Sequence, residues 1–159
     1  MVRIVQLEPD IAVAPQLIEG DFAEIARRGF RSIVNIRPDG EAPDQLPHAK
    51  ADAAARRHGL AFRYQPVMNV HVTDGDVVDD FARLMDRLPK PILFYCGTST
   101  RCAILWSQAA AGRLGLEEIL AVTHKAGYDL DFLHDTLAER AEWPVAAPVE
   151  SAALPTLAG

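Results

Sequence analysis

An unbroken apolar run, "PILFY" at residues 91–95, constrains the fold of this chain most strongly. Its length suits a β-strand, and a strand without polar positions is typical of one buried on both faces of a parallel sheet. After a short polar loop, the segment "CAILWSQAAAG" at 102–112 predicts a helix that is apolar almost all round. We therefore expect a central strand, a loop and a largely buried helix in direct succession.

The rest of the chain alternates between strand-like and helix-like segments. Gly29 and Gly59 follow two of the helical segments and are typical of C-terminal caps. Pro15 indicates that the first strand lies near a sheet edge. The expected strands cover 11–17, 31–36 and 60–67; the expected helices cover 21–29, 48–59, a segment capped by Thr73, and stretches near 116–126 and 129–140. This alternation predicts an α/β fold: a single domain with a mainly parallel central sheet flanked by helices.

Composition limits the class of protein. The chain has 159 residues, of which 49% are hydrophobic and 24% charged, as in ordinary globular domains. We expect a domain over 1–142 and a Pro- and Ala-rich surface tail over 143–159. The net charge of −6 argues against nucleic acid and anionic membranes as partners. No apolar run approaches the roughly 20 residues of a membrane span. With no secretion signal and only two cysteines, a cytoplasmic location with reduced thiols is expected.

The loop between the apolar strand and the buried helix is the candidate site. Cys96 directly follows the strand, at the sheet edge where α/β folds bind their ligands. Unpaired amide N–H groups at the start of the next helix, together with Arg101, favour a thiolate at Cys96 and an anion beside it. The alternative is a structural cysteine beside an ordinary turn. The intervening residues suit contact with an anion because they are small or hydroxylated: Gly97, Thr98, Ser99 and Thr100.

Several segments together carry a resemblance to a known family. The loop "YCGTSTRC" at 95–102 resembles the catalytic loop of the beta-lactamase-hydrolase-like, phosphatase-like domain family. Family signatures are also similar to "VNIRPDGEAPDQ" at 34–45, "YQPV" at 64–67 and "AGYDL" at 126–130. The resemblance covers roughly residues 5–135. It implies the fold of dual-specificity phosphatases, a small and mostly parallel sheet with helices on both sides.

The resemblance also implies roles for individual loop residues. Cys96 is implied to be the nucleophile and Arg101 the loop arginine. The family loop usually reads Cys-Arg-x-Gly-x-Arg, so Gly97 stands in place of an arginine and removes one anion-binding charge. Ser99 stands in place of the central glycine and must adopt whatever backbone geometry that glycine had.

The length of the loop favours sulfur chemistry over phosphate chemistry. Four residues separate Cys96 from Arg101, as in the loop of rhodaneses, whereas tyrosine phosphatases resemble one another in having five. We therefore expect a sulfurtransferase. Thiosulfate or glutathione persulfide supplies sulfane sulfur to Cys96, and a thiol or cyanide accepts it. No cofactor is expected, and the resemblance implies a role in sulfide metabolism. The alternatives are a phosphatase with a phosphocysteine intermediate and a non-enzymatic thiol sensor.

Acidic and sulfur-containing neighbours of the loop have two interpretations each. Asp74 and Asp76 are candidates for the general acid of a phosphatase, but acidic residues are also favoured at a helix N-terminus. Cys102 is either a resolving thiol for Cys96 or simply the start of a buried helix.

Arg37 is a further candidate for substrate binding. It either contacts an anionic substrate or forms an ion pair with Asp39 or Glu41. The five histidines show no metal-ligand spacing with the cysteines, so no metal is expected.

Overall fold

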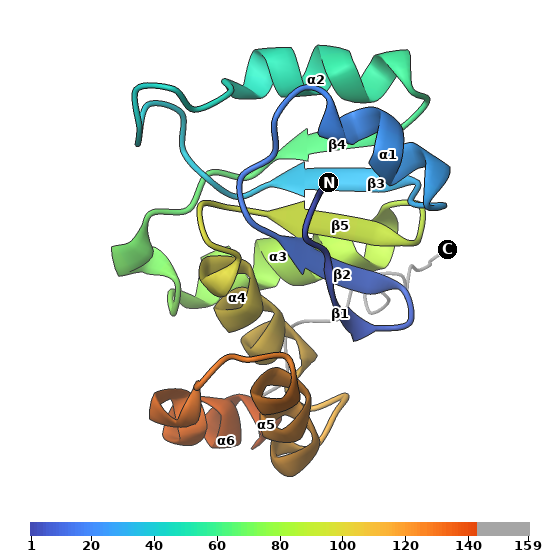
Figure 1. The fold of residues 1–159 in the computed structure, drawn as a ribbon. Helices are drawn as coiled ribbons and strands as arrows, with labels where there is room; N and C mark the ends of the chain where they lie inside the picture. The colour runs from blue at the N-terminus through green and yellow to red at the C-terminus, as the bar shows by residue number, and fades with distance from the viewer. Residues whose placement is uncertain (143–159) are drawn as a thin grey trace, which may run out of the picture.

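In the computed structural model, which describes residues 1–142, β5 (Ile92–Tyr95) lies at the centre of a five-stranded sheet (Figure 1). β2 (Ile11–Ala14) and β3 (Ser32–Asn35) flank β5 in parallel, and β4 (Ala61–Tyr64) continues the sheet beside β3. β1 (Val5–Glu8) pairs antiparallel with β2 at the other edge. All four residues of β5 are fully buried, which confirms the prediction of a central strand in a mainly parallel sheet.

Helices α1 (Asp21–Arg27) and α2 (His48–Arg57) cover one face of this sheet, drawn above it in Figure 1. Side chains alternate between the faces of a strand, so every second residue of β5 points towards these helices. Leu93 and Tyr95 belong to the same buried cluster as Phe22 of α1 and the alanines of α2. The small alanine side chains of α2 allow it to pack close to the sheet.

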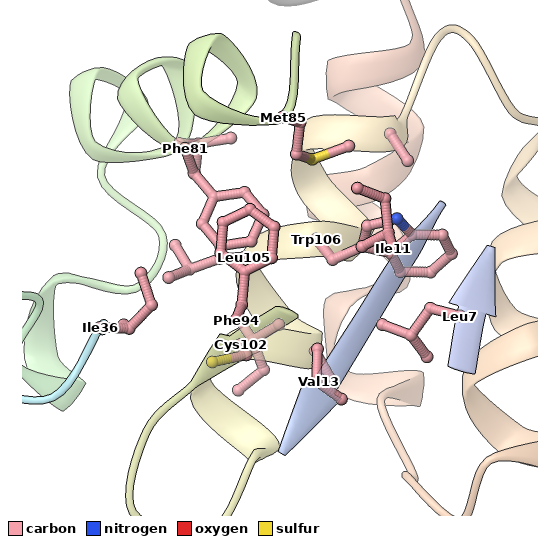
Figure 2. Close-up of a cluster of buried hydrophobic side chains, with 14 of the residues drawn as sticks. Leu7, Ile11, Val13, Ile36, Phe81, Met85, Phe94, Cys102, Leu105 and Trp106 are labelled. Atoms are coloured by element: carbon pink, nitrogen blue, oxygen red, sulfur yellow. The ribbon is translucent and has the colours of Figure 1, made fainter. Parts of the chain in front are cut away.

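The opposite face is covered by α3 (Gly75–Arg87) and α4 (Thr100–Ala110), with α5 (Leu116–Lys125) and α6 (His134–Glu142) packed against α4. Ile92 and Phe94 of β5 point into this larger cluster. Phe94 stacks on Phe81 of α3 with 4.2 Å between the ring centroids, beside Leu105 and Trp106 of α4 (Figure 2). The predicted buried helix is confirmed, because most of α4 is buried.

The edge strand β1 is joined to α4 by polar contacts. The Nε1–H of Trp106 donates to Glu8 Oε2 over 2.7 Å. Arg113, just beyond α4, donates to both carboxylate oxygens of Glu8 at 2.9 and 2.8 Å. These hydrogen bonds hold the pKa of Glu8 below its usual value against the effect of its partial burial, so the carboxylate stays charged.

The structure differs from the sequence prediction in its details. The sequence did not predict β1, which forms the edge beside β2. β2 lies next to the edge strand, as expected for a strand near the edge, but it ends at Ala14, before Pro15, rather than at residue 17. α3 is capped by Asp74 rather than Thr73. The last predicted helix is divided into a 3₁₀ turn, η2 (Asp131–Leu133), and α6. The predicted tail lies outside the described residues. None of the helices within 1–142 combines the length and apolar character required to cross a membrane.

Candidate active site

The loop that follows β5 begins at Cys96 and leads into α4 at Thr100. Parallel pairing places it at the carboxyl edge of the sheet, as predicted. Its backbone is fixed to the end of the neighbouring strand, since Cys96 N donates to Ala14 O at 3.3 Å and Gln16 N donates to Gly97 O at 3.2 Å. The central position of β5 therefore sets the position of the loop.

Ser99 has a left-handed backbone conformation, with φ at 77°. Among the described residues it is the only non-glycine residue with a positive φ. This conformation is the one that a glycine adopts without strain, and the resemblance described above implies that Ser99 stands in place of a glycine. The Ser99 hydroxyl lies 2.6 Å from the hydroxyl of Tyr128, in the segment after α5. This contact offsets part of the strain and ties the loop to the second half of the chain.

The pKa of the Cys96 thiol is lowered to about 6. The largest cause is a hydrogen bond from the Cys102 side chain, which outweighs the opposing effect of burial. The amide of Cys102, the charge of Arg101 and the amide of Ser99 lower it further. Burial raises the pKa of Cys102 itself well above its ordinary value, so Cys102 remains a thiol and can donate. The expected direction at Cys96 agrees with the structure, but the sequence did not indicate the part played by Cys102.

Arg101 is buried, and Glu41 holds its guanidinium group from the loop after β3. Nη1 and Nη2 of Arg101 each lie 3.1 Å from a Glu41 carboxylate oxygen, and Nη1 also donates to Val67 O at 2.9 Å. These contacts and the nearby Arg37 lower the pKa of Glu41, which therefore stays ionised. The Nε–H of Arg101 is buried and has no acceptor among the described residues. A buried donor of this kind is costly unless a ligand accepts from it.

A cavity of about 470 Å³ opens above the loop. Its lining contains the predicted residues Gly97, Thr98, Thr100, Arg101 and Arg37, together with Glu41, Asn69 and Ile104. Ser99 and Cys102 do not line it. Cys96 is fully buried and is not among the lining residues. The loop must therefore move locally before a substrate atom can reach the sulfur.

Arg37 and Glu41 come from the segment 37–47 that follows β3. Arg37 Nε donates to Glu41 Oε1 at 2.9 Å, and Arg37 Nη1 donates to Gln16 Oε1 at 3.1 Å. Both interpretations of Arg37 therefore remain compatible with the structure, since it pairs with Glu41 and also lines the cavity. Glu41 was considered only as a partner for Arg37; its contact with Arg101 joins segments 60 residues apart and has no local sequence signal.

The two candidate general acids do not line the cavity. Asp74 lies 2.9 Å from Nδ1 of His71, and Asp76 accepts a hydrogen bond from the amide of Val77. Both therefore have roles at the start of α3. Asn69, in the 3₁₀ turn η1 (Asn69–His71), does line the cavity and was not predicted. Within residues 1–142 no group of three or more His, Cys, Asp or Glu side chains is arranged to hold a metal ion.

Comparison with known proteins is consistent with this geometry. Residues 3–113 match the family model "Beta-lactamase hydrolase-like protein, phosphatase-like domain". A beta-lactamase hydrolase-like protein from Xylella fastidiosa strain 9a5c is 38% identical over 130 residues. That match covers 80% of this chain but 30% of the relative, so the chain spans about a third of the length of the curated relatives.

Solved structures share the fold. A Neisseria meningitidis protein thought to be a phosphatase is 30% identical, with a TM-score of 0.76 and coverage of 86% of this chain and 96% of that one. Tk-PTP in its active form, at 16% identity, has a TM-score of 0.66 over 88% of this chain and 96% of its own. TpbA from P. aeruginosa, solved with phosphotyrosine, has 14% identity and a TM-score of 0.58, covering 92% and 85%. The last two show the fold alone, which is that of tyrosine and dual-specificity phosphatases.

Proposed function

Because the chain belongs to the phosphatase-like domain family of beta-lactamase hydrolase-like proteins, we propose that it is a cysteine-dependent phosphatase, with Cys96 as nucleophile. One observation carries the proposal: the buried Nε–H of Arg101 has no acceptor among the described residues, and Arg101 lines a cavity at the loop that begins with Cys96, whose pKa is lowered to about 6. A phosphoryl oxygen would accept from this N–H. This assignment replaces sulfur transfer as the leading interpretation, because the family and the neighbouring structures support phosphatase chemistry.

The reaction has two displacement steps. The Cys96 thiolate attacks phosphorus; the S–P bond forms, the ester P–O bond breaks, and the alcohol or phenol leaves as its anion. Water then attacks the phosphocysteine, the P–S bond breaks, orthophosphate leaves and the thiolate is restored. Arg101 and the loop amides stabilise the equatorial oxygens in both steps. Cys102, as a protonated donor, favours departure of the thiolate in the second step.

The substrate needs a good leaving group. Within the described residues, Glu41 is the one carboxylate in the cavity lining, and its ion pairs with two arginines keep it deprotonated. Neither Asp74 nor Asp76 lines the cavity. Protonation of the leaving oxygen by a side chain is therefore absent from this arrangement, which favours aryl phosphates over alkyl phosphates.

The test measures the turnover of an activated aryl phosphate and of a simple alkyl phosphate, and the aryl phosphate should be hydrolysed faster. We expect turnover of 4-nitrophenyl phosphate, and a decrease in kcat of at least about 1,000-fold in Cys96→Ser. Cys102→Ser is the matched control, because it changes the adjacent sulfur but keeps a donor, and it should retain most of the activity. Undiminished hydrolysis by Cys96→Ser would exclude the phosphocysteine route.

Sulfur transfer is the second candidate, favoured by the length of the loop. Four residues between Cys96 and Arg101 form a smaller cradle than five, and transfer of a sulfur atom requires no general acid. The Cys96 thiolate would attack the outer sulfur of thiosulfate, break the S–S bond, release sulfite and become a persulfide. A thiol or cyanide would then remove that sulfur.

Mass spectrometry of the intact protein separates the two candidates. Incubation with thiosulfate adds one sulfur atom at Cys96 in a sulfurtransferase and nothing in a phosphatase. Incubation with 4-nitrophenyl phosphate followed by an acid quench traps one phosphoryl group in a phosphatase alone. Cys96→Ser is the control for both adducts, since it removes the attacking sulfur.

A further inference from the structure

A second guanidinium group lies beside Arg101 at the cavity. Glu41 Oε1 accepts from Arg37 Nε at 2.9 Å and from Arg101 Nη2 at 3.1 Å, so one carboxylate oxygen holds the two cations next to each other. Both side chains line the cavity. Two arginines and one glutamate carry a net charge of +1; a thiolate at Cys96 offsets it, and the Cys96→Ser protein retains it, in a chain whose overall charge is −6. The cavity is thus a local site for anions.

Arg37 keeps donors free for a ligand. Its Nε is directed to Glu41 and its Nη1 to Gln16, and both partners fix the plane of the guanidinium group. In the part of the chain that the structure describes, no group accepts a hydrogen bond from Nη2 of Arg37. The side chain is 16% exposed, so it is held in place while one end remains open to the cavity.

Gly97 explains how Arg37 comes so close to the loop. A Cβ atom built on Gly97 would lie 3.4 Å from both Cζ and Nε of Arg37, so the guanidinium group rests directly against the loop backbone. A long side chain at residue 97 would compete for this space. Arg37 therefore brings a positive charge to the loop position where Gly97 provides none.

From this arrangement we propose that Arg37 determines specificity by binding a second anionic group next to the phosphoryl group at Arg101. The inference rests on the proposed function and narrows it to one substrate class: phosphorylated compounds whose phosphoryl group has a second anionic group adjacent to it, of which a diphosphate is the smallest example. The volume of about 470 Å³ is within the usual range for small-molecule sites and leaves room beyond a single phosphoryl group.

The test is a calorimetric titration of the Cys96→Ser protein, which binds without turning over its ligand. The probes are inorganic orthophosphate and inorganic pyrophosphate. We expect pyrophosphate to bind at least about tenfold more tightly, because it adds charge-assisted hydrogen bonds to Arg37. A second substitution, Arg37→Gln, should remove this preference. Arg37→Lys should restore part of the preference through charge alone.

Arg63→Gln is the matched control, since it removes an exposed arginine of β4 that does not line the cavity. It should leave the preference intact. If both Arg63→Gln and Arg37→Gln lower pyrophosphate affinity equally, overall charge explains the effect and the inference is wrong. If orthophosphate binds but pyrophosphate binds no more tightly, the inference fails and the proposed function stands. If neither anion binds, the anion site of the proposed function fails as well.

Discussion

Replacement of Cys102 by alanine should make Cys96 a much weaker acid. The Cys102 side chain is the largest cause of the lowered Cys96 pKa, and alanine removes its S–H while keeping the backbone amide. A hydrogen bond to a charged group contributes about 1.5–3 kcal/mol, and 1.36 kcal/mol corresponds to about one pKa unit. Because the thiol is a weak donor, the lower part of this range applies. The Cys96 pKa should rise from about 6 by roughly one to one and a half units.

The measurement is the ultraviolet absorbance of the thiolate as a function of pH. It needs no reagent to reach the buried sulfur, and with Cys102 replaced, Cys96 is the only thiol in the chain. Cys102→Ser is the matched variant: its hydroxyl is a better donor in the same place, so the pKa should stay at or below about 6. Thermal unfolding of both variants checks that each remains folded.

The sign of the pH effect follows from the ionised form being the nucleophile. Alkylation or turnover at Cys96 should rise as the pH increases through about 6 in the wild-type chain and through a higher pH in Cys102→Ala. An unchanged midpoint in the alanine variant would refute the reasoning, because the amides and Arg101 would then account for the whole shift.

Three further predictions concern stability and the support of the loop. Ser99→Gly should relieve roughly 1 kcal/mol of left-handed strain but lose the contact with Tyr128. The free energy of unfolding, measured by urea denaturation, should therefore change by less than about 1 kcal/mol. A decrease of more than about 2 kcal/mol would show that the hydroxyl contact outweighs the strain. Glu41→Gln should destabilise the protein by roughly 1–3 kcal/mol in the same assay, because it leaves Arg101 buried without its charged partner, and an unchanged midpoint would contradict this. Phe81→Ala should lower the free energy of unfolding by about 3–5 kcal/mol, because it opens a cavity in the core. Phe132→Ala is the matched control: this side chain is exposed, so the loss should be less than about 1 kcal/mol.

The sequence was sufficient to predict the central part of the fold. A wholly apolar run at 91–95 has few alternatives to a buried central strand, and the alternation of segments then requires a parallel sheet. β1 was not predicted because its residues do not alternate regularly between buried and exposed positions. It also pairs antiparallel with β2, outside the alternation of strands and helices that predicted the parallel strands. Pro15 correctly indicated a strand near the sheet edge, but it did not show that β2 ends before it, at Ala14.

The site was predictable where its residues are contiguous. The loop 96–101 carries its own chemistry in its order of residues. The resemblance implied that Ser99 adopts the geometry of a glycine, and the structure shows that this geometry is left-handed. Glu41, Asn69 and the donor role of Cys102 were not accessible, because each depends on which distant segments the fold brings to one edge. Cys102 in particular gave equal support to a resolving thiol and to an ordinary helix residue.

The carboxylate of Glu8 joins the outer edge of the sheet to the helical segment that follows the candidate loop. Trp106 and Arg113, at the middle and the end of the segment that starts with the loop, both hold Glu8, and only β2 separates β1 from β5. Because these contacts run between side chains, β1 and α4 are joined directly as well as through the strands of the sheet, and loss of the Glu8 carboxylate would leave the N–H of Trp106 and the guanidinium group of Arg113 without this acceptor.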